Sequence, residues 1–287
     1  MICRIFATNR PLIVTFRGWW GTISGVSPSV QTPTPPADAP SPGGKPGPDA
    51  ARRTPAASRH ENVVDAIGTA VVTGALAPGD VVPAEHFAER FDASRSVVRE
   101  AVRVLESMGL VESRRRVGIT VLDRTRWNVF HPDIIRWRLA ADDTHRVDQL
   151  ASLSELRGGL EPHAAALAAA RATPEQCAAL SQAVRHMHLE AERGDLDAYL
   201  VADIAFHDTL LAASGNEMVA ALGGVVAEVL RGRTEHDLMP AHPNPDAIRL
   251  HGEVAAAVQV GDAARARAAM TSIIDEATTA LADELGA

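Results

Sequence analysis

Five side chains in the second half of the sequence have the types and spacing of a metal and anion site. Asp203 and His207 are four residues apart, so in a helix both project from the same face. His251 stands on a later segment that can return to them, and a carboxylate with two imidazoles suits a divalent cation such as zinc, nickel or manganese. Arg157 and Glu161 form a further i, i+4 pair. An arginine aimed at such a metal would bind a carboxylate ligand with two parallel hydrogen bonds.

Spaced arginines between residues 94 and 118 indicate a second kind of chemistry, contact with double-stranded DNA. Arg95, Arg99 and Arg103 lie at i, i+4 and i+8 on one face of a predicted helix, which Ser94 is placed to cap. A short predicted helix over 84–91 and a tight break precede it, an arrangement that suits insertion into a major groove. Arginine can bond guanine bidentately and can also bind phosphate. On spacing alone, a solvated face of a small helical domain explains these arginines equally well.

The residues between the arginines carry a resemblance to a known family. The run PAEHFAERFDASRSVVREAVRVLESMGLVE at 83–112 resembles the GntR family of bacterial transcription regulators. That family's winged helix has a Pro-Ser/Ala-Glu start, a Ser-Arg-x-x-x-Arg-Glu-Ala recognition helix and a Gly-Leu-Val strand entry. The resemblance implies that Arg95 and Arg99 read the operator, that Ser94 and Ser96 contact phosphates and that Gly118 lies at the tip of the wing.

Two positions depart from the family pattern. His86 follows the Pro-x-Glu motif where many members have arginine, and the usual Gly-x-Gly of the wing is here Arg116-Val117-Gly118. We expect Arg103, Arg115 and Arg116 to add to the DNA-binding surface, the last two through the backbone or the minor groove. One winged helix covers only a short half-site, so a homodimer on a palindromic operator is expected.

The elements that must position the first group of residues are helices. Apolar residues recur at helical spacing over 147–170, 174–192, 196–213, 217–231, 245–260 and 263–285. Thr173 to Gln176 is a capping box with Pro174 at the first helical position. The predicted fold is therefore mostly α, with an N-terminal winged helix-turn-helix and a C-terminal antiparallel helical bundle. Between them, a linker with a short helix is expected to pack Trp127 and Trp137 between the two domains.

The helical half carries a second resemblance, to the FCD effector domain of the FadR branch of GntR proteins. Four segments support it: ELRGGLEP at 155–162, ADIAFH at 202–207, ASGN at 213–216 and HGEVAAAVQVGD at 251–262. The resemblance implies that Asp203, His207 and His251 bind a metal that anchors a carboxylate effector, which Arg157 also bonds. Glu161 and Arg231 are further candidates for effector binding.

One of the family's usual metal ligands is absent from the sequence. It lies three residues after a methionine in the last helix, and here Met270 is followed by Ile273. This loss and the linker between Trp127 and Trp137 resemble the subgroup that responds to D-galactonate. A sugar acid is therefore the expected effector, while a small hydroxy acid such as lactate or another metabolite carboxylate stays open.

Three functions follow from these residues. We expect a ligand-responsive transcription regulator, a repressor that a carboxylate effector releases from DNA, and not an enzyme. A metal-dependent hydrolase or lyase using Asp203, His207 and His251 is an alternative, but no motif places a general base there and a DNA-binding module would be unexplained. A helical interaction protein without metal is the third, because Asp-x-x-x-His arises by chance in a chain with 11 histidines.

Composition sets further bounds on the 287-residue chain. The net charge of −8 divides into +4 for residues 1–58, −1 for 59–125 and −11 for 126–287, so any nucleic-acid contact must be local. The two cysteines are far apart and favour a reducing cytoplasm, and no apolar run reaches the roughly 20 residues that span a bilayer. We expect a disordered extension over 1–58, which could be a dispensable tail, a tether or a misassigned start. The winged helix should then cover 59–125, the linker 126–146 and the effector-binding and dimerisation domain 147–287.

Overall fold

The computed structural model describes residues 55–236 and 243–285, and the side chains of 60–236 and 243–281. The disordered extension predicted over 1–58 lies outside the described residues except for its last four. Those four form the start of helix α1 (Pro55–Val72), so the helix begins earlier than the sequence pattern indicated. No helix among the described residues is long and apolar enough to cross a membrane.

The N-terminal part is a helix-turn-helix with a small antiparallel sheet. Helices α1, α2 (Ala84–Arg90) and α3 (Arg95–Ser107) pack against strands β1 (Val81–Val82), β2 (Val111–Arg114) and β3 (Gly118–Val121). The strand order is β1-β3-β2, with Val111 opposite Val121 and Arg114 opposite Gly118. Apolar side chains from α1, α3 and the strands fill one core, as the predicted periodicity requires.

Local chemistry fixes the ends of the recognition helix α3. The Ser94 hydroxyl accepts a hydrogen bond from the Val97 amide at 3.3 Å, which confirms the predicted N-cap. Gly109 follows the helix with φ +75°, a left-handed conformation that glycine adopts readily. At the wing, Arg116 takes φ +67°. The arginine that replaces the family's usual glycine therefore keeps a backbone conformation that glycine prefers, at some cost in strain.

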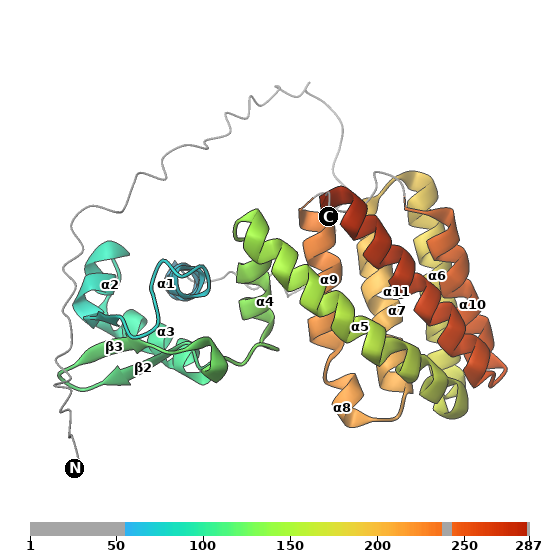
Figure 1. The fold of residues 1–287 in the computed structure, drawn as a ribbon, viewed down its shortest axis with the longest axis horizontal. Helices are drawn as coiled ribbons and strands as arrows, with labels where there is room; N and C mark the ends of the chain where they lie inside the picture. Colours follow the sequence, from blue (N-terminus) through green and yellow to red (C-terminus); the bar gives the residue numbers. More distant parts are fainter. Residues whose placement is uncertain (1–54, 237–242, 286–287) are drawn as a thin grey trace, which may run out of the picture.

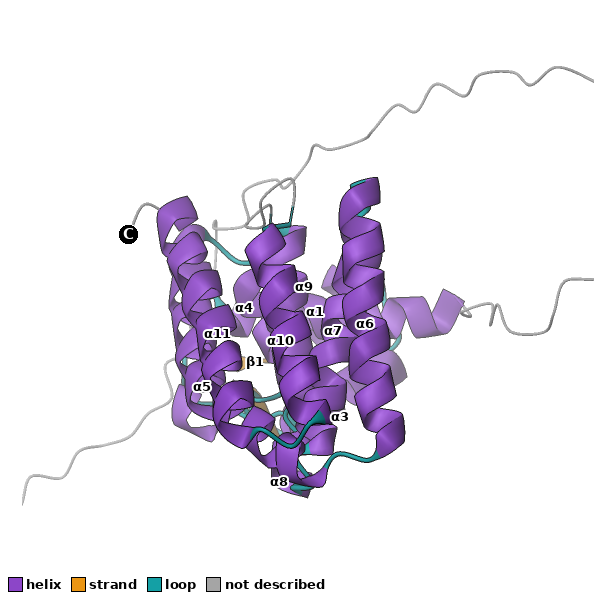
Figure 2. Ribbon diagram, turned by 90° about the vertical axis from the view of Figure 1, so that its right-hand side faces the viewer, coloured by secondary structure: helices purple, strands orange, loops and turns teal. Residues whose placement is uncertain are grey.

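The C-terminal part is an antiparallel helical bundle (Figures 1 and 2). Its helices are α5 (Asp143–Arg171), α6 (Pro174–Arg193), α7 (Leu196–Ala213), α8 (Glu217–Ala220), α9 (Gly223–Glu235), α10 (Pro245–Gln259) and α11 (Ala263–Leu285). Helix α11 packs on α5 and α10, α6 packs on α7 and α10, and α7 packs on α5 and α9. The chain is mostly α as expected. One predicted helix, over 217–231, is in fact two, because the chain turns at Ala221 and Leu222 and α9 then continues to Glu235.

A short helix joins the two cores. After a 3-10 turn (Arg124–Arg126), helix α4 (Pro132–Leu139) buries Ile134 and Trp137 in the core of the winged helix, and Ile135 and Leu139 in the core of the bundle. The carboxylate oxygen Oδ1 of Asp65, on α1, accepts hydrogen bonds from the Trp137 indole and from Arg136, both at 2.9 Å. Helix α4 therefore belongs to both cores, and neither can move relative to it without losing buried contacts.

Helix α1 lies close to α4 at Gly68, where a Cβ atom would overlap the indole ring of Trp137. We expect Gly68→Ala to lower the free energy of unfolding by about 1–3 kcal/mol, because a well-packed contact cannot accept the added methyl group. Gly159→Ala is the matched control: that glycine lies within α5 and a Cβ there would meet open space, so alanine should raise helix stability by roughly 0.5–1 kcal/mol. Urea unfolding of both variants measures this, and equal effects would contradict the close α1–α4 contact.

Candidate functional site

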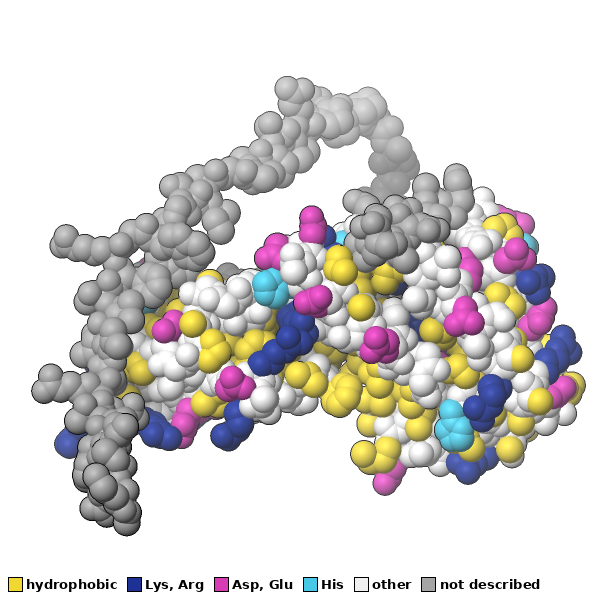
Figure 3. Space-filling model, viewed as in Figure 1, with side chains coloured by type: hydrophobic (Ala, Val, Ile, Leu, Met, Phe, Trp, Pro, Cys, Tyr) yellow, Lys and Arg dark blue, Asp and Glu magenta, His cyan; other side chains and the backbone are white. Residues whose placement is uncertain are grey.

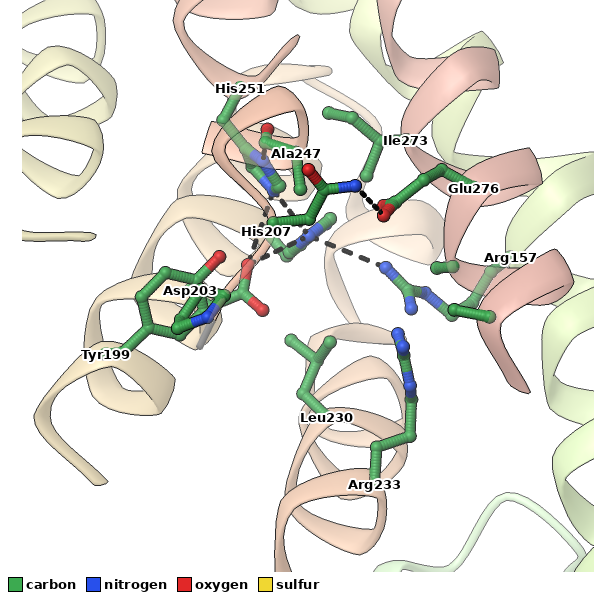
Figure 4. Close-up of a pocket in the computed structure, with 14 residues that line it drawn as sticks. Arg157, Tyr199, Asp203, His207, Leu230, Arg233, Ala247, His251, Ile273 and Glu276 are labelled. Atoms are coloured by element: carbon green, nitrogen blue, oxygen red, sulfur yellow. Dashed lines mark hydrogen bonds and ion pairs between the residues drawn. The ribbon is translucent and has the colours of Figure 1, made fainter. Parts of the chain in front are cut away.

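The bundle brings together the side chains that the sequence singled out. Helix α7 supplies Asp203 and His207, α10 supplies His251, and α5 supplies Arg157 and Glu161. All five are at least nine-tenths buried. Asp203 Oδ1 lies 3.4 Å from His207 Nε2 and 3.3 Å from His251 Nε2, and the two Nε2 atoms are 3.4 Å apart (Figure 4). The three atoms that could ligate a metal thus form a near-equilateral triangle, although their residues are separated by up to 48 positions in the sequence.

The other nitrogen of each imidazole is held by a fixed partner. His251 Nδ1 lies 2.7 Å from the carbonyl oxygen of Ala247, so it carries the proton and donates it to that oxygen. His207 Nδ1 lies 2.6 Å from Glu161 Oε2. Contacts of this kind set the tautomer and orientation of histidines that bind metals. When His207 is neutral with its proton on Nδ1, both Nε2 atoms present lone pairs to the point that Asp203 also faces.

When both histidines are neutral, three electron-rich atoms face one point, and a cation between them would interact favourably with all three. The buried Oδ1 of Asp203 accepts no hydrogen bond from any described residue. The spacing of 3.3–3.4 Å matches that of neighbouring ligand atoms bound about 2.0–2.1 Å from a divalent ion. Asp203, His207 and His251 are also the one group of possible metal ligands that meets these distances among the described side chains. The residues present fit a borderline divalent metal, and Ile273 forms an apolar wall beside them.

Burial and charge shift the titration of these groups in opposite directions. Burial alone would raise the pKa of Glu161, but Arg157 and His207 outweigh it and lower the pKa to about 2. Burial alone would lower the pKa of His207, but Glu161 and Asp203 raise it to about 9. The pKa of Asp203 is held well below its usual range, since its contacts with the two histidines outweigh burial. Without metal, this raised pKa favours the protonated form of His207, whose positive charge then lies between the carboxylates of Glu161 and Asp203.

A small cavity opens beside the triangle, and other helices complete its wall. Tyr199 lies one turn before Asp203 on α7, Glu276 comes from α11, and Arg233 comes from α9. The structure does not bring Arg231 here: it is half-exposed and bonds Glu228 on its own helix. Glu161 does not line the cavity either, but it contacts both Arg157 and His207 from behind.

Sequence reasoning missed Arg233, Tyr199 and Glu276. A signal for Arg233 was present, since it follows the buried Val226 and Leu230 by seven and three residues and so falls on the apolar stripe of α9. Arg231 lies off that stripe. Tyr199 could have been found in the same way, four residues before Asp203.

The predicted DNA-binding residues lie together on the surface of the winged helix. Six of them are exposed and come from α3 and its N-terminus or from the hairpin turn, namely Arg95, Ser96, Arg99, Arg103, Arg115 and Arg116. Ser94 is exposed as well as capping α3, and Gly118 is half-buried at the start of β3. Arg95 lies 3.7 Å from Glu85, and Arg103 bonds Glu100 at 3.0 Å. Figure 3 shows basic side chains along the lower edge of this domain and mixed charge over the bundle.

Comparison with known proteins agrees with both halves. The model of the gntR family of bacterial regulatory proteins matches residues 59–121, and that of the FCD domain matches 152–276. The galactonate operon transcriptional repressor of Escherichia coli (strain K12) is 32% identical over 220 residues, which cover 75% of this chain and 94% of the relative. The chain belongs to the gntR family of bacterial regulatory proteins.

Another relative aligns over most of the same length. The transcriptional regulator LutR of Bacillus subtilis (strain 168) is 32% identical over 206 residues, covering 70% of this chain and 90% of that protein. Among solved structures, a GntR protein of Streptococcus agalactiae is 26% identical, with a TM-score of 0.42 and coverage of 75% and 97%. FCD domains are known to bind metal ions, and in this gntR protein Asp203, His207 and His251 form a possible site.

The raised pKa of His207 gives metal binding a pH dependence with a defined sign. A metal needs neutral His207, so below about pH 9 it must displace a proton, and its apparent affinity should rise with pH by about tenfold per unit. Titration calorimetry with zinc in buffers of different ionisation enthalpy measures the released proton. Glu161→Gln removes the carboxylate that does most to raise the pKa of His207, and should reduce that release at neutral pH. A zinc affinity independent of pH between about pH 6 and 8 would contradict the site.

Proposed function

We propose that this gntR-family protein is a transcriptional repressor that a sugar acid, anchored at a metal on Asp203, His207 and His251, releases from its operator. The observation that carries the proposal is the buried triangle of donor atoms beside a cavity whose wall includes two arginines. A metal bound there supplies positive charge and open coordination positions for a carboxylate and a neighbouring hydroxyl group. The galactonate operon repressor among the relatives supports an aldonic acid as the first one to test.

The DNA side of the proposal rests on the exposed face of α3. We assign base reading to Arg95 and Arg99, which are exposed on α3, and contact with the flanking backbone or minor groove to Arg115 and Arg116, which are exposed in the hairpin turn. A single recognition helix covers a short half-site, so we propose a homodimer on a palindromic operator. A regulator of this kind works where the chromosome is, in the cytoplasm.

The regulator is the better-supported function compared with an enzyme. A metal-dependent hydrolase needs a general base within reach of the metal-bound reactant. Glu161, which could fill that role, is engaged by Arg157 Nε at 2.5 Å and lies 2.6 Å from His207 Nδ1, behind the ring that faces the cavity. Its pKa of about 2 also makes it a weak base. These contacts suit a residue that orients His207 rather than one that accepts protons from a substrate.

Helix α4 supplies the route from cavity to DNA. Its Leu139 packs against α9 at Gly232, where a Cβ would lie 2.6 Å from Leu139 Cδ1, and Gly232 adjoins the cavity residue Arg233. The opposite side of α4 buries Trp137 in the core of the winged helix. We propose that α9 can take two positions relative to α4, one compatible with DNA binding and one not. A ligand that binds these two states with different affinity would shift the equilibrium between them by that difference in binding free energy.

Loss of a recognition arginine should weaken operator binding and leave the fold intact. Arg99→Ala removes an exposed side chain with no buried contact, and operator affinity should fall by about 1–3 kcal/mol if the arginine bonds a base bidentately. Arg265→Ala, an exposed arginine on α11, is the control for loss of one positive charge. Fluorescence anisotropy with labelled operator DNA measures the affinity of both variants. The same titration gives the number of protomers bound per palindrome, which we expect to be two. Equal affinities of Arg99→Ala and wild type would remove α3 from the interface.

Loss of a metal ligand should uncouple the effector from DNA. We expect His207→Ala to bind no zinc and to stay on the operator when D-galactonate, D-gluconate or lactate is added, because the carboxylate has lost its anchor. His251→Gln, which keeps a polar side chain, should behave alike, and His163→Ala, exposed on α5, should respond as wild type does. Operator release under titration with each acid is the measurement. If the acid that releases wild type from the operator also releases His207→Ala and His251→Gln, the effector site lies elsewhere.

A further inference from the structure

Two arginines face the cavity, and only one of them has a partner among the described residues. Arg157 is paired with Glu161: its Nε donates to Oε1 at 2.5 Å, and its Nη2 lies 3.4 Å from Oε2. These are the two nitrogens that form the side-on edge of a guanidinium, one of the two edges that can bind a carboxylate bidentately. Glu161 therefore occupies the side-on edge of Arg157, and Nη2 of Arg157 also lies 3.5 Å from His207 Nε2. Arg157 keeps its positive charge in the cavity wall, but a buried carboxylate of the protein already balances it.

Arg233 has the opposite properties. Its residue is 8% exposed, its buried Nε has no hydrogen-bond partner, and no described carboxylate lies within ion-pair distance. Figure 4 shows its guanidinium reaching up from α9 into the cavity toward that of Arg157. Burial and the like charge of Arg157 lower the pKa of Arg233, and the opposite charges of Asp203 and Glu276 only partly offset this. Glu276 itself accepts a hydrogen bond from Asn244 at 2.7 Å.

A buried guanidinium whose Nε has no partner among the described residues is costly, because a buried charge without a partner loses its hydration and gains nothing in return. Buried polar groups in native proteins are nearly always bonded, so an exception at a cavity points to a ligand. The ligand must be an anion, since guanidinium has five donors and no acceptor. A carboxylate satisfies two donors at once.

We infer that Arg233 binds the effector's carboxylate bidentately, while Arg157 holds Glu161 and through it orients His207. This inference rests on the proposed function and names the residue that recognises the acid. It also gives the cavity a direct link to the linker helix, because Gly232, the neighbour of Arg233, is the residue of α9 that contacts Leu139 of α4.

Arg233→Met tests the inference with Arg231→Met as its matched control. Both remove an arginine from α9, two residues apart, but Arg231 is half-exposed and bonds Glu228 outside the cavity. In zinc-loaded full-length protein, titration calorimetry with D-galactonate, D-gluconate and lactate should show acid affinity about 10- to 100-fold weaker for Arg233→Met and unchanged for Arg231→Met. Zinc affinity should be unchanged in both. Arg233→Lys keeps the charge without the fork and should fall between Arg233→Met and wild type.

Thermal unfolding without any acid separates a ligand-binding role from a structural one. Removing an unpaired buried charge should leave the Tm of Arg233→Met equal to or above that of wild type. Arg157→Met should have a lower Tm, because it leaves Glu161 buried beside His207 alone. A clear loss of stability in Arg233→Met, or undiminished acid affinity in that variant, overturns the inference. If wild type binds none of the three acids while Arg233→Met keeps full stability, the proposal of a sugar-acid effector is wrong. The observation that Arg233 has no stabilising partner would then still hold, and the anion that it binds would be of another class.

Discussion

The helices of the bundle pack around buried polar and charged side chains that lack suitable partners within the described residues. With both histidines neutral, Asp203 and the two histidine Nε2 atoms meet as three acceptors at one buried point. Arg233 faces the neighbouring space, and its buried Nε has no acceptor among the described residues. A cation at the first position and an anion at the second would satisfy both at once. The two ligands are complementary, since a metal-bound carboxylate places its negative charge beside the arginine. Three helices, α7, α9 and α10, contribute these groups, so their relative packing depends on what the cavity contains.

This dependence matters for DNA because α4 belongs to both cores. Ile135 and Leu139 are buried with bundle residues, and Ile134 and Trp137 with residues of the winged helix. A shift of α9 against Leu139 therefore changes contacts that continue to Asp65 and Gly68 on α1. Packed cores have few alternative arrangements, so small changes at such a contact tend to select between discrete states.

Much of this could be predicted from the sequence where the signal is local. The cap at Ser94 and the capping box at Thr173 both involve residues within a few positions, and the structure confirms them. The pairing of Asp203 with His207 follows from helical spacing. The approach of His251 and the partner of each imidazole depend on how helices return, which periodicity does not specify. Arg233 was missed because one helix was predicted over 217–231, and the turn at Ala221 and Leu222 resets which side chains of α9 face inward.

Anomalous X-ray diffraction from crystals of the zinc-loaded protein tests the central claim most directly, because it locates the metal without reference to any assay of DNA or effector. The account predicts one strong anomalous peak in the bundle, within about 2.0–2.2 Å of the Nε2 atoms of His207 and His251 and of a carboxylate oxygen of Asp203. A zinc peak bound by other residues, or coordination that leaves out either histidine, would contradict it.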